Sequence, residues 1–371
     1  MSMRIGVPTE IKDNEFRVAI TPDGVTQLVK NGHEIFIQAG AGLGSSISNE
    51  EFQVSGATMV NTADEIWSTN ELILKVKEPI AAEFHRMRPN QILFTYLHLA
   101  AGRECAQALV DSGITAIAYE TVLNSDGTTP LLAPMSEVAG RLAPQVGADA
   151  LLRPKGGRGV LLGGVSGTRK GRVVVLGGGV AGFNSAQIAH GMGADVIIFD
   201  RNSDRLKYLK DYFKGEVETS LADSPSIESA VTEADLVIGA VLIPGTKTPK
   251  LVSNATVARM KPGSVLVDIS IDQGGCFEDS KPTTHADPTY KVHNSIFYCV
   301  ANMPGAVPHT STYALTNATL PYISSIANNG WREALTRDSG FKPGLNVHKG
   351  AVVYKPVADA LNMPYVDAWA I

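Results

Sequence analysis

A glycine-rich segment has the most specific spacing in the sequence. Gly177, Gly179 and Gly182 form GxGxxG between an apolar run, RVVVL, and a helical pattern. The first glycine permits a tight turn, the second lets a backbone approach a pyrophosphate, and the third lets helix and strand pack closely. Because the phosphates would face the N-terminus of that helix, this pattern in a complete βαβ unit predicts a dinucleotide site.

An acidic residue closes the same unit. Asp200 ends the next apolar run, DVIIF, at about the 20-residue spacing typical of a ribose-binding carboxylate. A carboxylate there can accept hydrogen bonds from the adenosine ribose and would repel a 2′-phosphate, which favours NAD over NADP. The neighbouring Arg201 leaves NADP open, and a flavin is the less favoured dinucleotide. The non-functional alternative is an ordinary tight turn with a solvated Asp200.

Four polar residues are candidates for the chemistry: Arg17, Lys77, His98 and Asp272. They are expected at or just beyond strand ends in apolar surroundings. Arg17 could clamp a substrate carboxylate with its bidentate guanidinium, or it could be a surface arginine. Lys75 shares a face with Lys77 by strand alternation, so one of the two is expected to point into a cleft.

The histidine and the aspartate each have a structural alternative. His98 follows ILFTYL and could be a satisfied core histidine or an acid–base group. Asp272 follows the strand SVLVDIS of the second series, where a doubly wound fold places groups that face the nicotinamide. Asp268 is closer to the strand body and is expected to be structural. These residues alone support only an NAD-binding protein with two lobes.

Two series of alternating strands and helices would position these residues. The expected strands are RIGV, EIFIQ, TMV, LILKVK, ILFTYL and TAIAYE in the first series, and RVVVL, DVIIF, DLVIGAV, SVLVDIS and SIFYCVA in the second. The alternation predicts an α/β fold of two doubly wound, Rossmann-like domains with mainly parallel sheets, joined by linker helices around an active-site cleft. In the first helix, Thr21 is the expected cap, Pro22 the first residue and Gly32 the end.

The domain boundaries follow from a turn and a helical pattern. The polar turn NSDGTTP precedes a helical pattern from about Pro134 to Leu152, which we interpret as the linker. After Asn302 the chain is expected to be helical to about Leu335, with no later strand of comparable strength, and to pack on the first domain. We therefore expect a substrate domain of residues 1–130 and 305–371 and an NAD-binding domain of residues 131–304.

Composition restricts the class of partner and the compartment. The 371 residues have a net charge of −5, are 44% hydrophobic and 19% charged, and contain no long Lys/Arg run. A small-molecule ligand is expected, without nucleic acid or membrane. Cys105, Cys276 and Cys299 are widely spaced and lack metal-ligand spacing, so neither a disulfide framework nor a metal site is predicted. A cytoplasmic protein is expected.

The sequence resembles alanine dehydrogenases from end to end. The resemblance rests on NEFRVAITP, ILKVKEPI, FTYLHLA, APMSEVAGR, GGRGVLLGG, VDISIDQGGCFE and CVANMPGAVPHTSTYALTNATLPY. It implies a homohexamer that interconverts L-alanine with pyruvate and ammonia using NAD. Arg17 and Lys77 would then bind the substrate carboxylate and carbonyl, and Lys77 matches the second lysine of KVKEP. His98 would be the acid–base partner at the substrate oxygen, and Asp272 a second acid–base group beside the nicotinamide.

The same resemblance implies a set of residues that line the NAD site. They are Ser136, Gly177, Gly179, Val180, Ala181, Gly182, Asp200, Arg205, Val241, Leu242, Ile269, Asp272, Asn302 and Met303. One position departs from the family: Ala222 stands where members often have a serine near the adenine, which leaves Ser220 and Ser224 as candidates for that contact.

Three alternatives are weighed against this function. The first is the NAD(H)-binding component of proton-translocating transhydrogenase, which as a family does not retain the KVKEP lysine and the strand-end histidine together. The second is a non-catalytic NAD-binding sensor, against which the intact charged quartet argues. The third is a saccharopine-type dehydrogenase, whose larger substrate would need further polar anchors.

Overall fold

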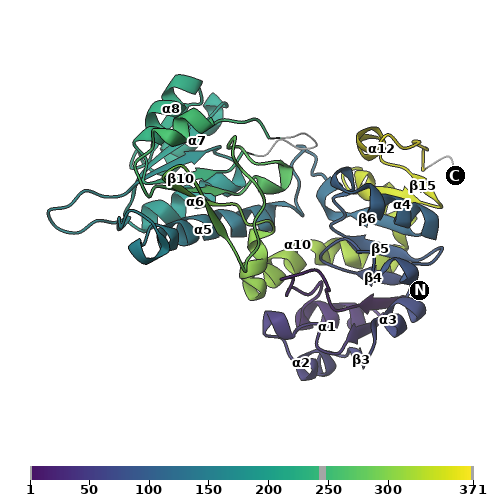
Figure 1. Ribbon diagram of the computed structural model, residues 1–371. Helices are drawn as coiled ribbons and strands as arrows, with labels where there is room; N and C mark the ends of the chain where they lie inside the picture. The colour runs from purple at the N-terminus through teal and green to yellow at the C-terminus, as the bar shows by residue number, and fades with distance from the viewer. Residues whose placement is uncertain (1, 242–247, 369–371) are drawn as a thin grey trace. The chain divides into compact units, whose positions relative to one another are not determined.

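The computed structural model describes residues 2–241 and 248–368 and divides into two compact units (Figure 1). Unit 1 combines the chain up to Met135 with the chain from Val307 onward, and unit 2 is Ser136–Ala306. The expected boundaries, 130/131 and 304/305, lie a few residues from these. The linker helix α5, Ala133–Ala150, begins in the range of unit 1 and ends in that of unit 2.

The described part of unit 1 contains an eight-stranded sheet. Its strands are β1 (Arg4–Val7), β2 (Glu34–Gln38), β3 (Thr58–Val60), β4 (Leu72–Leu74), β5 (Ile92–Thr95), β6 (Thr115–Ala118), β14 (Leu345–His348) and β15 (Ala351–Val352). The order is β15-β14-β6-β5-β4-β1-β2-β3, with β1 to β6 parallel. The winding direction reverses between β1 and β4, which is where doubly wound sheets bind their ligands.

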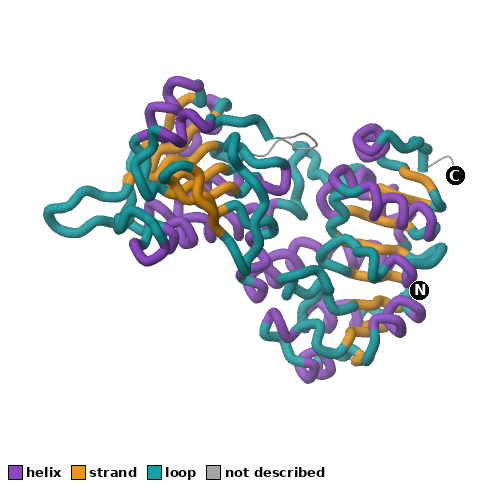
Figure 2. The backbone as a smooth tube through the Cα atoms, in the orientation of Figure 1, coloured by secondary structure: helices purple, strands orange, loops and turns teal. Residues whose placement is uncertain are grey.

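Helices lie on both sides of the strand layer in unit 1, as Figure 2 shows. They are α1 (Pro22–Lys30), α2 (Asn49–Val54), α3 (Ala63–Thr69), α4 (Arg103–Ser112), α10 (Pro308–Asn329), α11 (Trp331–Arg337) and α12 (Lys355–Leu361). The expected start of α1 is confirmed, because Thr21 accepts a hydrogen bond from the Gly24 N–H and Pro22 is the first helical residue. Gly32 follows the helix in the left-handed region, at φ 87°.

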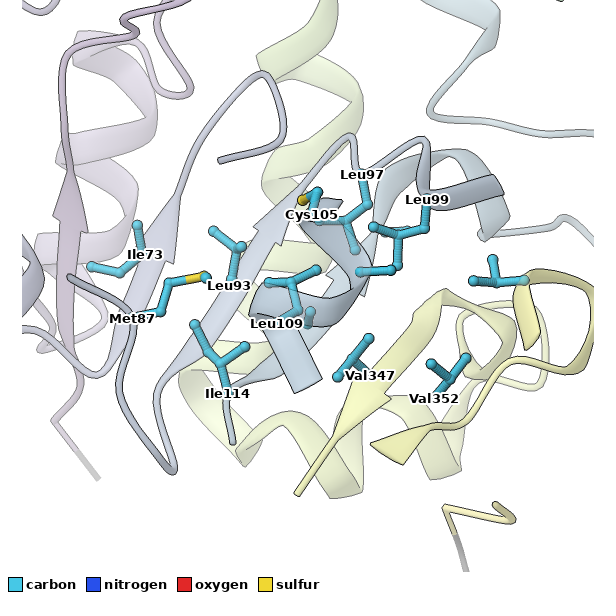
Figure 3. Close-up of a cluster of buried hydrophobic side chains, with 14 of the residues drawn as sticks. Ile73, Met87, Leu93, Leu97, Leu99, Cys105, Leu109, Ile114, Val347 and Val352 are labelled. Carbon is cyan, nitrogen blue, oxygen red and sulfur yellow. The ribbon is translucent and has the colours of Figure 1, made fainter. Parts of the chain in front are cut away.

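Successive residues of β5 show how the two faces of the sheet are filled. Leu93 belongs to a cluster that includes α4 residues such as Leu109 and the tail residues Val347 and Val352 (Figure 3). Phe94 points to the opposite face by strand alternation, where its ring centroid is 5.8 Å from that of Phe341. Both faces of β5 are therefore buried, which explains the continuous apolar run in the sequence.

The described part of unit 2 contains a second, seven-stranded sheet. Its strands are β7 (Arg172–Leu176), β8 (Asp195–Asp200), β9 (Glu218–Leu221), β10 (Leu236–Gly239), β11 (Val265–Asp268), β12 (Thr289–Val292) and β13 (Ser295–Tyr298). Its helices besides α5 are α6 (Val180–Gly191), α7 (Ser203–Tyr212), α8 (Ser224–Thr232) and α9 (Asn254–Ala258). The order β12-β13-β11-β10-β7-β8-β9, with only β12 antiparallel, is the dinucleotide-binding arrangement. The predicted α/β fold of two Rossmann-like domains with mainly parallel sheets is confirmed.

The expectation for the C-terminal tail was partly wrong. The tail joins unit 1 as expected, but after α11 it contributes the buried strand β14, which pairs antiparallel with β6. Two further strands, β9 and β12, were not expected. Conversely, LILKVK, ILFTYL and TAIAYE form only short strands before the chain turns. Among residues 2–241 and 248–368, no helix is long and apolar enough to cross a membrane.

Candidate active site

The glycine motif forms the turn between β7 and α6 in unit 2. Gly177 has φ 96°, and a Cβ there would lie 2.8 Å from the Ala240 carbonyl oxygen. At Gly182 a Cβ would lie 1.7 Å from the Gly177 carbonyl oxygen, so the helix can pack here only without a side chain. A Cβ on Gly179 would meet no atom within 4 Å. Two glycines are thus required by the protein itself, whereas the open space at Gly179 fits the approach of a pyrophosphate.

The carboxylate of Asp200 lies against this turn. Its Oδ2 accepts a hydrogen bond from the Gly178 N–H at 2.6 Å, and its Oδ1 accepts one from the Asn202 N–H at 2.8 Å. Arg205 donates from Nε to the Gly178 carbonyl at 2.6 Å and stacks over the Tyr208 ring. Asp200 is half-buried and each oxygen retains acceptor capacity, so it can also accept from a ribose hydroxyl.

The other predicted cofactor residues of unit 2 follow the carboxyl ends of its parallel strands. Val241 follows β10, and Ile269 follows β11 with its N–H bonded to the Gly239 carbonyl. Asn302 and Met303 follow β13, and Asn302 has φ 62°, which is uncommon for a residue with a side chain. Strand ends that share one edge of a parallel sheet form the ligand-binding edge of this fold.

The remaining predicted cofactor residues lie on helices or outside the described chain. Val180 and Ala181 are in the first turn of α6, and Ser136 is half-buried on α5. Leu242 lies outside the described residues. Ala222 packs beside the cluster under β8 and donates its N–H to the Asp200 carbonyl oxygen.

The two aspartates after β11 have different surroundings. Asp268 is buried and accepts hydrogen bonds from the N–H groups of Ser270 and Cys276 and from the Ser280 hydroxyl. These hydrogen bonds fix the loop that follows β11, which agrees with the structural role expected for Asp268. Asp272 is exposed, in the short 3₁₀ helix Ile271–Gln273 of that loop.

In unit 1, Arg17 is buried in a bidentate ion pair. Its Nε and Nη2 donate to the two oxygens of Glu15 at 2.6 and 2.5 Å, and Nη1 approaches the Met135 sulfur at 3.1 Å. The Glu15 carboxylate raises the Arg17 pKa despite burial, so the cation is retained inside the protein. Arg17 was expected near a strand end. It lies instead in the loop between β1 and α1, with only 2% of its surface exposed, so it is not a surface arginine.

The two lysines after β4 differ in burial and in their partners. Strand alternation does not apply to them, because β4 ends at Leu74. Lys75 is buried between Glu10 and Glu83, with both Nζ–oxygen distances 3.0 Å. Lys77 is half-buried, and its backbone N–H lies 3.4 Å from the Glu10 carboxylate. Lys75 is therefore committed to an internal ion-pair triad.

His98 lies just past β5 and has an unusual backbone. Its φ of 47° is in the left-handed region, and its ring stacks on Tyr96 with centroids 5.6 Å apart. Burial, together with the positive charges of Lys77, Lys12 and Arg17, lowers the pKa of His98 to about 3. The imidazole is thus neutral at neutral pH, and the charges of these three cations act on it.

Sequence analysis missed the carboxylates that hold these residues, of which Glu10 and Glu15 are buried and Glu120 is half-buried. Glu15 binds Arg17, Glu10 contacts the loop of Lys77, and Glu120 accepts hydrogen bonds from the backbone at His98. The partner of Glu15 is only two residues away, whereas Glu10 and Glu120 bind segments 67 and 22 residues away, which no local pattern in the sequence indicates. No group of three His, Cys, Asp or Glu residues in the described chain could hold a metal ion, and the three cysteines are free.

The fold and these two sites define a class of protein: a two-unit α/β oxidoreductase that uses a nicotinamide dinucleotide. The models of the alanine dehydrogenase/PNT N-terminal and C-terminal domains match residues 6–139 and 143–355. A Mycolicibacterium smegmatis protein named alanine dehydrogenase is 60% identical over 366 residues, 99% of each chain. The chain therefore belongs to the alanine dehydrogenase/PNT family.

Solved structures show the same relationship. One titled L-alanine dehydrogenase has a TM-score of 0.94 at 50% identity and covers 97% of this chain and 99% of its own. A Sinorhizobium meliloti transhydrogenase has a TM-score of 0.82, covering 94% of this chain and 100% of its own. Because the latter is only 23% identical, it shows a shared fold alone.

Proposed function

We propose that the protein catalyses the NAD-dependent oxidative deamination of L-alanine to pyruvate and ammonia, and the reverse reaction. The observation that carries the proposal is the place of Arg17, Lys77 and His98 in the loops after β1, β4 and β5, which are neighbouring strands of one sheet. The chain that holds them is 60% identical, end to end, to an alanine dehydrogenase. The balanced reaction is L-alanine + NAD⁺ + H₂O → pyruvate + NH₄⁺ + NADH + H⁺.

NAD fits the sequence and geometry of unit 2. When bound, NAD supplies the hydride acceptor of the reaction. The open space at Gly179 and the remaining acceptor capacity of Asp200 would hold the pyrophosphate and the ribose. Val180, Ala181, Arg205, Val241, Leu242, Ile269, Asn302, Met303 and Ser136 would complete the site. Asp200 would also exclude a 2′-phosphate, which supports NAD over NADP.

Two cations of unit 1 would bind the substrate. The Arg17 guanidinium is planar, permanently charged and fixed by Glu15, which suits a carboxylate-binding role. Lys77 would bind the carbonyl oxygen of pyruvate and stabilise the negative charge that develops on it. Lys75 is less suited to this role because two buried carboxylates already surround its ammonium.

His98 would move the proton at the substrate oxygen. Before substrate binds, burial keeps its pKa low, and the charges of three cations contribute to the same shift. A bound carboxylate would offset part of that positive charge and raise the pKa of His98, so the imidazole gains basicity when the substrate is present. Asp272, exposed on its loop in unit 2, is the second proposed acid–base group.

Assembly and location complete the proposal. We infer a cytoplasmic homohexamer from the resemblance to alanine dehydrogenases. The free, buried cysteines suit a reducing compartment. Light scattering coupled to size-exclusion chromatography would measure the number of subunits.

The test is NADH formation by purified protein with NAD and L-alanine at alkaline pH, beside L-serine, saccharopine and NADP. We expect alanine-dependent NADH formation that falls by about 10² to 10⁴ in His98→Asn, since asparagine tolerates the left-handed backbone but cannot transfer the proton. His85→Asn, at an exposed histidine of the same unit, is the matched control and should keep full activity. Binding of NAD without turnover of any amino acid would instead favour the transhydrogenase-like or sensor function.

A further inference from the structure

The ends of the two central strands of unit 1 are held in the same way. β4 and β5 are parallel neighbours, and each is followed after two residues by a candidate site residue, Lys77 or His98. In both loops a carboxylate, buried in Glu10 and half-buried in Glu120, accepts hydrogen bonds from two consecutive backbone N–H groups, of which the second belongs to the site residue. Each carboxylate lies just past the strand on the outer side: Glu10 follows β1, the neighbour of β4, and Glu120 follows β6, the neighbour of β5.

At the end of β5 the carboxylate is that of Glu120. Its Oε1 accepts from the His98 N–H at 2.6 Å and from the Leu97 N–H at 3.2 Å. At the end of β4 the carboxylate belongs to Glu10. Its Oε1 accepts from the Val76 N–H at 2.6 Å and approaches the Lys77 N–H at 3.4 Å. Paired N–H groups of this kind form a concave site for an anionic oxygen.

The conformation of His98 is what Glu120 stabilises. A non-glycine residue at φ 47° is uncommon and costs free energy unless its surroundings compensate. Removing the Glu120 carboxylate from water without hydrogen-bond partners is also unfavourable. The hydrogen bonds between Glu120 and the turn therefore stabilise both the carboxylate and the left-handed backbone of His98. Tyr96 then limits the ring through stacking, and its own hydroxyl is fixed on the Leu131 carbonyl.

We propose that Glu120 is a positioning residue for the reaction: it binds the turn after β5 and thereby aims the His98 imidazole at the substrate. Glu10 has the corresponding place beneath Lys77, but it also pairs with Lys75, so its removal would disrupt an ion-pair triad as well. Glu120 is therefore the residue on which positioning can be tested separately. The proposal rests on the proposed role of His98.

The test compares Glu120→Ala with Glu120→Gln. Oε1 of Glu120 accepts from both N–H groups, and Oε2 shares only the Leu97 N–H, at 3.2 Å. The amide oxygen of glutamine can therefore keep the short hydrogen bond to His98, whereas alanine cannot. We expect kcat for alanine oxidation to fall about 100-fold in Glu120→Ala and to stay within about tenfold of wild type in Glu120→Gln. NAD affinity should be unchanged in both.

Crystal structures of both variants give a readout that does not depend on turnover. We expect φ of His98 to become negative in Glu120→Ala and to stay positive in Glu120→Gln. If Glu120→Ala does not fold, Glu120→Asp, whose carboxylate is one methylene shorter, should show an intermediate loss of kcat with a displaced His98. Glu51 is the matched control: it accepts a backbone N–H in the capping box of α2, and Glu51→Ala should leave kcat unchanged.

Two results would overturn the proposal. Wild-type kcat in Glu120→Ala, with His98 still at positive φ, would show that the carboxylate does not position the histidine. Equal loss in Glu120→Gln and Glu120→Ala, with His98 unmoved, would show that Glu120 transfers a proton itself. If the wild type turned over no amino acid, the proposed function would fail, while the crystallographic comparison would still decide the positioning role.

Discussion

The Arg17–Glu15 pair is an internal charge pair whose members depend on each other. Both side chains are almost fully buried, and the guanidinium donates to both carboxylate oxygens. Removing one member leaves the other charge buried without compensation, which costs more than the intact pair contributes. A change at Arg17 should therefore affect folding as well as substrate binding.

We expect Arg17→Met to lower the free energy of unfolding by about 3–5 kcal/mol and to abolish alanine oxidation. The double variant Glu15→Gln/Arg17→Met should regain much of the stability, because no charge remains buried, but none of the activity. Urea unfolding and NADH formation measure the two effects. Recovery of activity in the double variant would exclude Arg17 from binding the substrate carboxylate.

The low pKa of His98 makes stability depend on pH. An unfolded histidine titrates near pH 6.5, whereas folded His98 titrates at about 3, so only the unfolded chain binds this proton between these values. The stability gained from a neutral His98 is complete above about pH 6.5 and is lost as pH falls toward 3.

Unfolding curves of wild type and His98→Asn should therefore converge or cross as the buffer is taken from about pH 8 to about pH 5. The wild type loses free energy of unfolding over this range through His98, and the variant does not. His85→Asn should follow the wild type, since that side chain is exposed. Parallel curves for wild type and His98→Asn would mean that His98 titrates normally in the folded protein.

At the scale of the element, the three glycines of the turn between β7 and α6 have different roles. Gly177 and Gly182 are needed for the fold, and Gly179 is the one expected to matter for ligand binding. A side chain at Gly182 would collide with the Gly177 carbonyl, whereas one at Gly179 would point into open space. The backbone of Gly179, at φ −64°, is accessible to any residue. Only the ligand would therefore oppose a side chain at Gly179.

Gly179→Ala should fold with a stability within about 0.5 kcal/mol of wild type, yet its Kd for NAD should rise at least about tenfold. Gly182→Ala should lose about 1–3 kcal/mol or fail to fold, because backbone atoms cannot yield to the added methyl group. Thermal unfolding and calorimetric titration with NAD measure the pair. Unchanged NAD affinity in Gly179→Ala would place the pyrophosphate elsewhere.

The elements that sequence analysis predicted well carry their signals locally. The cap, first residue and terminating glycine of α1 lie within its own few residues, and GxGxxG lies within one turn. The strand β14 was missed because it has only four residues, includes His348, and is buried by pairing with β6 across the sequence. Glu10 and Glu120 were missed for the same reason, since their partners lie 66 and 22 residues away.

At the scale of the whole molecule, the two units differ in how the chain supplies them. Unit 2 is one continuous segment with its own sheet and its own buried cluster around Val174, Leu266 and Phe297. Unit 1 needs two segments, because β14 and β15 extend a sheet whose other strands lie in the first 118 residues. Unit 2 alone therefore meets the requirements of an independently folding domain.

We expect residues 136–306, produced separately, to unfold cooperatively and to bind NAD, while lacking alanine oxidation because Arg17, Lys77 and His98 are absent. Circular dichroism during heating and NAD titration measure the two properties. A fragment with Gly179→Ala should fold equally well and bind NAD more weakly. A fragment that stays unfolded would show that the contacts of α5 with the rest of the chain are needed for folding.

The split of unit 1 also sets the order of events on the ribosome. The first six strands emerge early, but the edge of β6 has no partner until residues 345–348 are translated, long after unit 2 is complete. During that interval the nascent chain presents an open strand edge and part of an apolar cluster that Val347 and Val352 later cover. A slow or interrupted translation of the last segment should therefore expose this edge to aggregation and to chaperones, even though the dinucleotide-binding unit has already folded.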